Sequence, residues 1–340
     1  MSPGIIDSPM LPANLCGLWV FRRHTYGYTT TAGTMGDVNA AKTAVSVCLL
    51  GIAQDGGRPQ PGCQKECCTG LASIAENKRH PVSLGIIGDD GSGHLFEATR
   101  DLAWQLQLWG KSTGISPQIN SLWITHAHHG HVDGLGLFGK TAMDVRDLPL
   151  YTSPSFFRLM KNTPHWLEML SRGVFSSKPF ESGKEYSPSS IQSEREVGFS
   201  VMPLKIPHRD ELSDTHAMII KGPNKTLLFL PDHDTWEETL TLHGQDSIRE
   251  LLDKYEIDIA LIDGTFWSSI ELTGRSQAKV PHPPVSQTLE LVGSRMEGDP
   301  QIYFIHINHT NPLHNENSPE YQKVIEMGWN IGFEGMVINL

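Results

Sequence analysis

Four histidines within six residues constrain this chain more than any other feature. The apolar run 119–125 leads directly into them: His126, His128, His129 and His131. In an extended chain, residues i and i+2 point to the same side, so His126 and His128 can share one ion. Zinc-class metals need several such imidazoles converging on one point. A solvated histidine-rich loop is the alternative, but a position between a predicted strand and a glycine turn favours a metal site.

Strands and helices alternate along the chain. Apolar and β-branched runs predict strands over 44–50, 83–87, 94–98, 119–125, 199–206, 216–221, 226–230, 257–262 and 301–305. Helical spacing predicts helices over 100–109, 155–170, 235–255 (with a break at Gly244) and 286–296. This alternation is typical of a layered α/β fold.

Five of the predicted strands end in a histidine or an aspartate: His126, His208, Asp232, Asp263 and His306. Active sites in layered α/β folds gather at strand ends, where a rigid sheet holds the ligands and the loops vary. One such residue is usually structural, but five in step predict a shared site.

Composition narrows the class of protein. The chain has 340 residues, enough for one large domain or two small ones. No apolar run approaches the roughly 18 residues that span a bilayer, so we expect a soluble protein that does not act at a membrane. A net charge of −11 without a basic block argues against nucleic acid as a tight partner. We expect a small-molecule substrate; a homodimer is an open alternative.

Five cysteines are an odd number in a chain of this size, so a disulfide scaffold is unfavourable and we expect a reducing compartment, the cytoplasm. Cys63, Cys67 and Cys68 have a spacing that suits a structural metal, but no fourth ligand is evident, which favours plain thiols. Residues 1–44 lack periodicity and are predicted to be an N-terminal extension, either disordered or an organelle-targeting segment, before a domain over 45–340.

The motif Thr125-His-x-His-x-x-His131-x-x-Gly134, with His208, Asp232 and a late histidine, resembles the metallo-β-lactamase superfamily. Within it the chain is similar to relatives of the pyrroloquinoline-quinone (PQQ) synthesis protein B. Three stretches carry that similarity: Gln54-Asp-Gly-Gly-x-Pro59 with Gly62-Cys63, Phe304-Ile-His-Ile-Asn308 with Thr310-Asn-Pro312, and the terminal segment 332–340. The resemblance implies an αββα sandwich of two mixed sheets flanked by helices, with a one- or two-metal site at one edge.

The resemblance also implies metal ligands. His126, His128 and His208 would hold the first ion, and Asp232 would bridge to a second. His131 and His306 would hold that second ion, with His309 as the rival of His306 because both follow the same strand. The expected ion is Zn²⁺, with Fe²⁺ or Mn²⁺ as alternatives.

One departure concerns position 130. The superfamily pattern has an aspartate directly before the last histidine of the cluster, where this chain has Gly130. A register through His129, His131 and Asp133 restores an acid but loses the closing histidine and the strand spacing. We therefore expect one tight ion and a weak second one, unless one of four residues compensates: Asp133, His129, His309 or Asp234. On this view, Gly130→Asp should strengthen the second site.

The chemistry follows from the ligands. A zinc-like ion lowers the pKa of bound water from about 15.7 to about 7 and so supplies hydroxide at neutral pH. Asp232 and Asp234 can orient that water or accept its proton, and His282 can protonate the leaving group unless it is a surface-loop residue. The sequence predicts a metal-dependent hydrolase of an ester, lactone, phosphodiester or related bond. An iron-dependent oxidative enzyme and a non-catalytic metal-binding protein remain alternatives.

Overall fold

The structure, a computed structural model, describes residues 43–71, 77–190, 195–272 and 280–340. The extension predicted over 1–44 lies almost entirely outside the described residues, as does Cys16.

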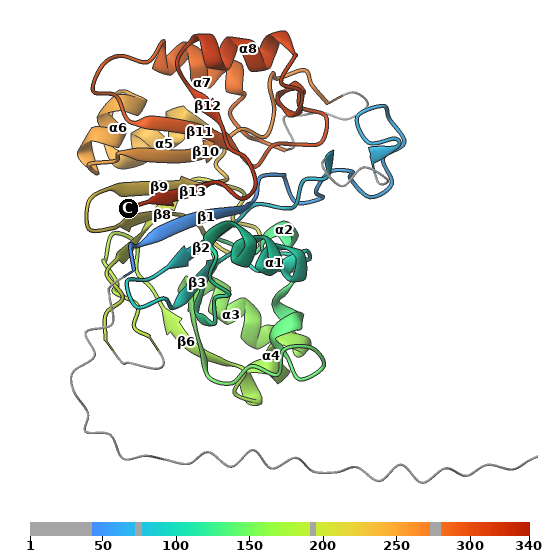
Figure 1. Cartoon of the computed structure of the whole chain (residues 1–340), viewed down its shortest axis with the longest axis vertical. Coiled ribbons are helices and arrows are strands. Elements are labelled where there is room, and N and C mark those ends of the chain that lie inside the picture. The colour runs from blue at the N-terminus through green and yellow to red at the C-terminus, as the bar shows by residue number, and fades with distance from the viewer. Residues whose placement is uncertain (1–42, 72–76, 191–194, 273–279) are drawn as a thin grey trace, which may run out of the picture. The chain divides into compact units, whose positions relative to one another are not determined.

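Two mixed sheets form the centre of the fold (Figure 1). The seven-stranded first sheet has the order β13 (Val337–Asn339), β1 (Ser46–Gly51), β2 (Ser83–Ile87), β3 (Gly93–Phe96), β4 (Ile119–Trp123), β5 (Leu148–Thr152) and β6 (Phe175–Pro179). The six-stranded second sheet has the order β12 (Asn330–Ile331), β11 (Gln301–Ile305), β10 (Ile259–Asp263), β9 (Thr226–Leu230), β8 (Thr215–Lys221) and β7 (Ser200–Ile206). Each sheet contains parallel and antiparallel pairs.

Helices flank both sheets (Figure 1). Those beside the first sheet are α1 (Leu102–Thr113), α3 (Pro154–Asn162) and α4 (Pro164–Ser171). Those beside the second are α5 (Trp236–His243), α6 (Ile248–Lys254), α7 (Val285–Val292) and α8 (Pro319–Glu326). Three short turns complete the described elements: α2 (His129–Val132), η3 (Leu135–Phe138) and η5 (Pro312–His314). The predicted αββα sandwich is confirmed.

Strand periodicity explains why the layers form. In β1, Val47 and Leu49 belong to the core between the sheets, whereas Cys48 and Leu50 belong to the core beneath α1 and α3. Successive side chains of a strand point to opposite faces, so a strand that is apolar at every position needs a cover on both faces. The second sheet supplies one cover and the helices supply the other.

The structure corrects one predicted helix and adds two strands that were not predicted. The helix predicted over 155–170 is two helices, because Pro164 lacks an N–H and begins α4 after the extended residue Thr163. Strands β5 and β6 were missed, since Pro149 within β5 and the polar composition of β6 hide the strand signal. The predicted break at Gly244 is confirmed: α5 ends there in a left-handed residue with φ of 63°.

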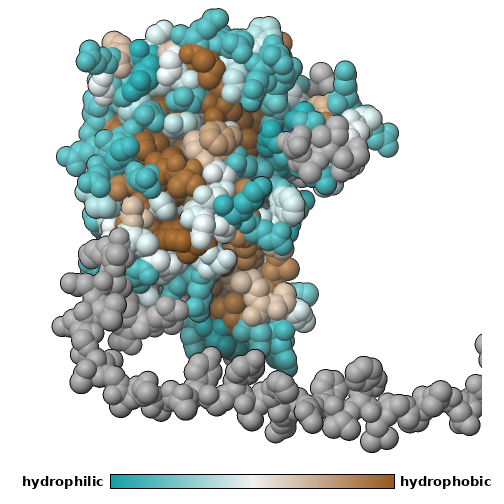
Figure 2. Space-filling model, in the orientation of Figure 1, coloured by the Kyte–Doolittle hydropathy of each residue, from teal (hydrophilic) through white to brown (hydrophobic). Residues whose placement is uncertain are grey.

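Figure 2 shows a surface that is largely hydrophilic, with hydrophobic residues gathered in the middle of the face shown. Across the described ranges, no helix is long and apolar enough to cross a membrane.

Candidate metal centre

The strand ends that the sequence singled out meet at one edge of the sandwich. β4 leads to His126, β7 to His208, β9 to Asp232 and β11 to His306, and each of these side chains is buried. His131 joins them from α2. Since both sheets and one helical turn contribute, the site exists only in the folded chain.

Three imidazole nitrogens form the first group of donors. Nε2 of His126 lies 2.9 Å from Nδ1 of His128. That Nδ1 atom lies 3.2 Å from Nε2 of His208. A tetrahedral zinc ion with bonds of about 2.0–2.1 Å to nitrogen keeps its ligand atoms about 3.3 Å apart. The three nitrogens therefore have the spacing expected of ligands to one ion.

Asp232 lies between this group and a second one. Its Oδ1 is 3.8 Å from Nε2 of His208, and its Oδ2 is 3.9 Å from Nε2 of His126. On the other side, Oδ2 is 2.9 Å from Nε2 of His131 and 3.4 Å from Nε2 of His306. Asp232 therefore lies within reach of both groups of donors.

A fourth residue completes the second group. Oδ1 of Asp55, in the loop after β1, lies 3.6 Å from Nε2 of His131 and 3.8 Å from Nε2 of His306. The sequence analysis quoted the stretch that contains Asp55 but did not predict a ligand there, because Asp55 lies far from the histidine cluster along the chain and follows no predicted strand directly.

Buried polar atoms show that these residues suit a cation. Among the described residues, the buried Nε2 atom of His306 forms no hydrogen bond. An unsatisfied buried polar atom costs about 1–3 kcal/mol, so a ligand at this point is favourable. Imidazole and carboxylate donors together suit zinc, iron or manganese. The donor set therefore fits a metal centre.

The electrostatics favour the metal-binding forms of His126, His128 and Asp232. Burial lowers the pKa of His126 well below its usual value, and the neighbouring His131 lowers it further. Burial likewise lowers the pKa of His128 to about 4. Both rings are therefore neutral at pH 7, the form that binds metals. Burial alone would raise the pKa of Asp232, but the surrounding His306 and His131 outweigh it and keep the carboxylate ionised.

Three further carboxylates lie against the Nδ1 atoms of histidines in the centre. The pairs are Asp234 with His208 at 3.0 Å, Asp263 with His282 at 2.6 Å and Glu97 with His131 at 3.4 Å. Such partners fix the ring orientation of metal-binding histidines and raise their basicity. Glu97 was missed by sequence reasoning, although it ends an apolar strand as the recognised residues do.

The structure decides the alternatives for His282 and for the residues around Gly130. His282 is only 6% exposed, so it is not a surface-loop residue. The His129 side chain is 84% exposed and pairs with Asp133 at 3.2 Å. Asp133 also pairs with Arg100 at 3.0 Å. Neither residue compensates for Gly130, because both are engaged outside the centre; Asp234 is engaged with His208.

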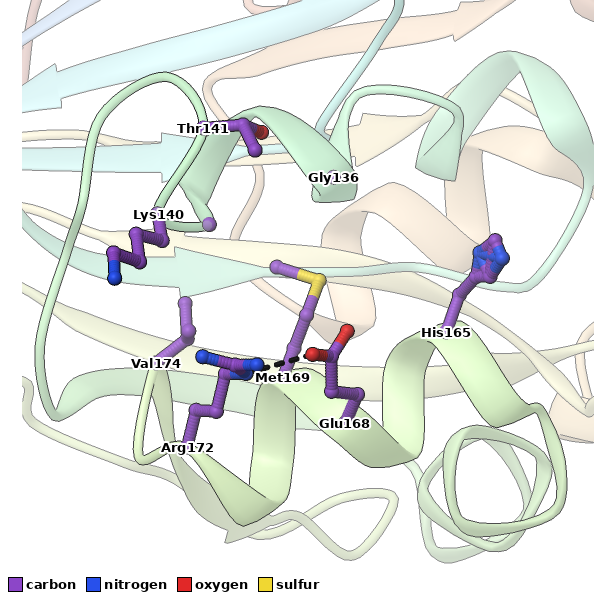
Figure 3. A pocket seen from close by; sticks show the side chains of 9 residues that line it. Gly136, Lys140, Thr141, His165, Glu168, Met169, Arg172 and Val174 are labelled. Carbon is purple, nitrogen blue, oxygen red and sulfur yellow. Dashed lines mark hydrogen bonds and ion pairs between the residues drawn. The ribbon is translucent and has the colours of Figure 1, made fainter.

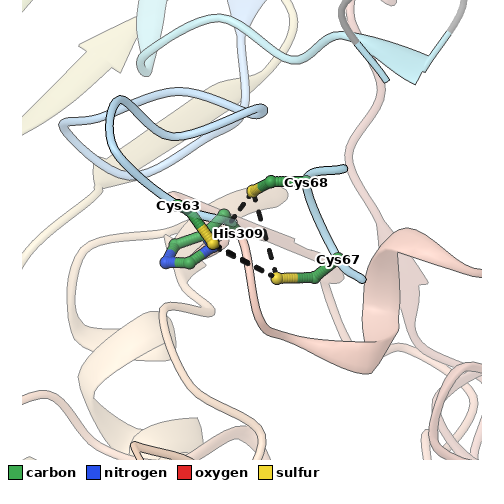
Figure 4. A group of neighbouring side chains, drawn as sticks. All are labelled: Cys63, Cys67, Cys68 and His309. Atoms are coloured by element: carbon green, nitrogen blue, oxygen red, sulfur yellow. Dashed lines mark hydrogen bonds between the residues drawn. The ribbon is translucent and has the colours of Figure 1, made fainter. Parts of the chain in front are cut away.

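His309 also departs from expectation. It lies with the three cysteines, not beside His306 (Figure 4). Its Nδ1 is 3.4 Å from Sγ of Cys67 and 3.3 Å from Sγ of Cys68, and Cys63 and Cys67 are 3.9 Å apart at sulfur. Tetrahedral zinc with bonds of about 2.3 Å to sulfur separates two sulfurs by about 3.8 Å. His309 thus offers a fourth donor that the sequence analysis did not find, and the four side chains have donor types and spacings that suit a Cys₃His zinc site.

Two hollows flank the metal centre. One of about 290 Å³ is lined by Asp55, Gln60 and Arg100, among others. One of about 250 Å³ is lined by Asp234, His282 and the prolines around it. A cavity of about 450 Å³ lies elsewhere, against α4, and Figure 3 shows Arg172 in it paired with Glu168. It has none of the metal-centre residues in its lining, so size does not identify the reactive site.

Known proteins share both the sequence pattern and the fold. Coenzyme PQQ synthesis protein B of Cupriavidus necator is 24% identical over 320 residues, which cover 87% of this chain and 99% of that protein. The protein of the same name from Acinetobacter baumannii is 27% identical over 328 residues, covering 86% and 99%.

Two solved structures have the same fold. Zn²⁺-bound PqqB from Methylobacterium extorquens has a TM-score of 0.67 at 22% identity, covering 87% of this chain and all of that one (100%). A diphosphatase from the PhnP family has a TM-score of 0.56 at 17% identity, covering 88% and 98%. The family model described as the beta-lactamase superfamily domain matches residues 95–307, more than half of the chain. The chain therefore belongs to the metallo-β-lactamase superfamily.

Proposed function

We propose that this protein is a metal-dependent hydrolase of a small molecule that contains an ester, lactone, phosphodiester or related bond. The observation that carries the proposal is the bridging position of Asp232 between two groups of buried donors, three nitrogens on one side and two nitrogens with a carboxylate on the other. A zinc-class ion held there lowers the pKa of bound water and polarises the bond under attack.

The chain's own residues have separate roles in this proposal. Asp232 would contribute one carboxylate oxygen to each of the two donor groups. Asp234 keeps His208 in the tautomer whose Nε2 faces the centre, and its side chain, 24% exposed, can also contact a water molecule. His282 is the proton donor to the leaving group, because Asp263 binds its Nδ1 while its buried Nε2 is free of hydrogen bonds within the described residues.

The substrate class rests on the two hollows beside the centre. Each is small, so we propose a small molecule that reaches the metal centre past Asp55 or past His282. The diphosphatase from the PhnP family shares the fold, so phosphodiesters and diphosphates are the first compounds to test. We also propose a cytoplasmic location, which the odd number of cysteines in the sequence supports.

A second candidate is an iron-dependent oxidative enzyme. Two relatives that match this chain over 99% of their own length are named for PQQ synthesis. A site of histidines and carboxylates with open positions suits non-heme iron as well as zinc.

Metal content and turnover distinguish the two candidates. Protein purified without added metal is analysed for its elements, then assayed on phosphodiester, lactone and ester panels and for oxygen consumption. Bound zinc supports the proposal if hydrolysis is lost in His126→Ala and kept in His129→Ala. Of these two histidines, His126 faces the centre and His129 does not. Iron with oxygen consumption and no hydrolysis would replace it with the second candidate.

A further inference from the structure

The loop after β1 is fixed against the end of β11. The Ile307 N–H donates to the carbonyl of Ile52 at 2.7 Å, and the Gln54 N–H donates to the carbonyl of Ile307 at 3.1 Å. Ala53 forms isolated bridges to both Pro81 and Ile307. Asp55, the residue after Gln54, is therefore held beside the strand end that carries His306.

Asp55 contacts the same two histidines of the second donor group as Asp232 does. Its Oδ1 lies 3.6 Å from His131 and 3.8 Å from His306 at Nε2, and Asp232 approaches the same two nitrogens at 2.9 and 3.4 Å. Two imidazoles and two carboxylates are a complete set for a four-coordinate ion. The Asp55 side chain is 37% exposed, so this position remains open to the neighbouring hollow.

Gly130 packs against Asp55 and leaves space for it. A β-carbon at Gly130 would overlap Oδ1 of Asp55 and lie 2.5 Å from its Cα, closer than the 3.0 Å that real β-carbons respect. Gly130 lies in α2, where the backbone accepts any L-residue, so conformation does not require the glycine. The space taken by Asp55 does.

We infer that Asp55 is the second carboxylate ligand of the metal centre, supplied by the loop after β1, and that Gly130 is glycine to leave room for it. The inference rests on the metal centre of the proposed function but not on its reaction. Ions about 3.5–4 Å apart repel, and Asp55 adds a negative charge to that of Asp232. The sequence-based expectation of a weak second ion, strengthened by Gly130→Asp, is thereby reversed.

The test is a Co²⁺ titration of apo-protein, followed by calorimetry and visible absorption. Thiolate-to-metal charge transfer reports ions in the cysteine cluster, so the remaining bound ions are those of the histidine and carboxylate centre. The variants are Asp55→Asn, Gly130→Ala and Gly130→Asp. Asp133→Asn is the matched control, since it removes the same charge three residues from Gly130 but outside the centre.

Wild type and Asp133→Asn should each bind two ions at the centre. Asp55→Asn should bind the second ion at least about 100-fold more weakly, the upper range for loss of an outer partner alone. Gly130→Ala and Gly130→Asp should also lose it, because a β-carbon at position 130 overlaps Asp55.

Equal second-ion affinity in Asp55→Asn and Asp133→Asn would overturn the inference, as would a single centre ion in wild type. A second ion bound as tightly in Gly130→Ala as in wild type would overturn the link to Gly130. Two ions without hydrolysis would refute the proposed function alone.

Discussion

Oε1 of Glu97 lies 3.4 Å from Nδ1 of His131, and the two side chains are 0% and 1% exposed. Burial alone would lower the pKa of His131, but the carboxylates of Glu97 and Asp232 outweigh it and raise that pKa well above its usual value. Glu97 itself has a φ of 69°, in the left-handed region, a strain that persists where surrounding structure fixes a functional residue. Glu97 is thus a positioning residue for His131.

Glu97→Gln should therefore weaken the ion held by His131 by about 10- to 100-fold, because the ring loses its charged partner. Calorimetric metal titration measures this affinity. Glu168→Gln is the control, because Glu168 is exposed and pairs with Arg172 at the end of α4, away from the metal centre. Metal affinity in Glu97→Gln equal to that of the control would show that the contact does not position the ligand.

His126→Ala and His128→Ala should each remove about one equivalent of metal and nearly all activity while the domain stays folded, since each removes one nitrogen of a three-nitrogen site. Elemental analysis and circular dichroism measure the two effects. His129→Ala is the matched control, because that histidine lies between the ligands along the chain but is 84% exposed. Unchanged metal content in both test variants would contradict the assignment.

His306→Ala and His309→Ala should affect different metals, although the two residues are three positions apart. His306→Ala should lower metal binding at the centre and leave thiolate-to-cobalt charge transfer intact. His309→Ala should weaken the charge-transfer band, because its Nδ1 lies against Cys67 and Cys68. The reverse pattern would exchange the roles of the two histidines.

Cys67→Ser should lower the melting temperature of zinc-loaded protein but leave that of chelator-treated protein nearly unchanged. A metal that binds only the folded state stabilises it by mass action, so the difference should appear only when metal is present. Turnover should stay near wild type, since the cysteines lie outside the reactive centre. Equal losses of stability with and without metal would mean that Cys67 contributes through packing.

Glu334 should give stability a pH dependence of its own. Burial raises its pKa from 4.5 to about 7. The folded state then binds more protons than the unfolded state between these values, so this residue's contribution to stability falls as pH rises from about 4.5 through 7. Melting temperatures of Glu334→Gln and wild type should diverge over that window, with the variant more stable at pH 8. Parallel curves would contradict this prediction.

Much of the fold was readable from local pattern. Apolar runs such as 44–50 and 301–305 have one periodicity and few competing states. The strands predicted there agree with β1 (Ser46–Gly51) to within two residues and with β11 (Gln301–Ile305) at both ends. Strands β5 and β6 were not predicted, because Pro149 and a polar sequence mask them. The pairing of β5 with β4, and of β6 with β5, stabilises them.

The sequence by itself determined which residue types were available for chemistry and that His126, His128 and His131 are near one another, since short spacing along a strand end fixes local geometry. Tertiary structure decided the contacts between residues far apart in the chain that the strand-end pattern did not predict. Asp55 meets His131, Glu97 supports it, and His309 joins the cysteines although it follows the same strand as His306. The reason is physical: a loop's position is set by backbone hydrogen bonds to other elements, such as those of Ile307 with residues 52 and 54, and no local pattern encodes them.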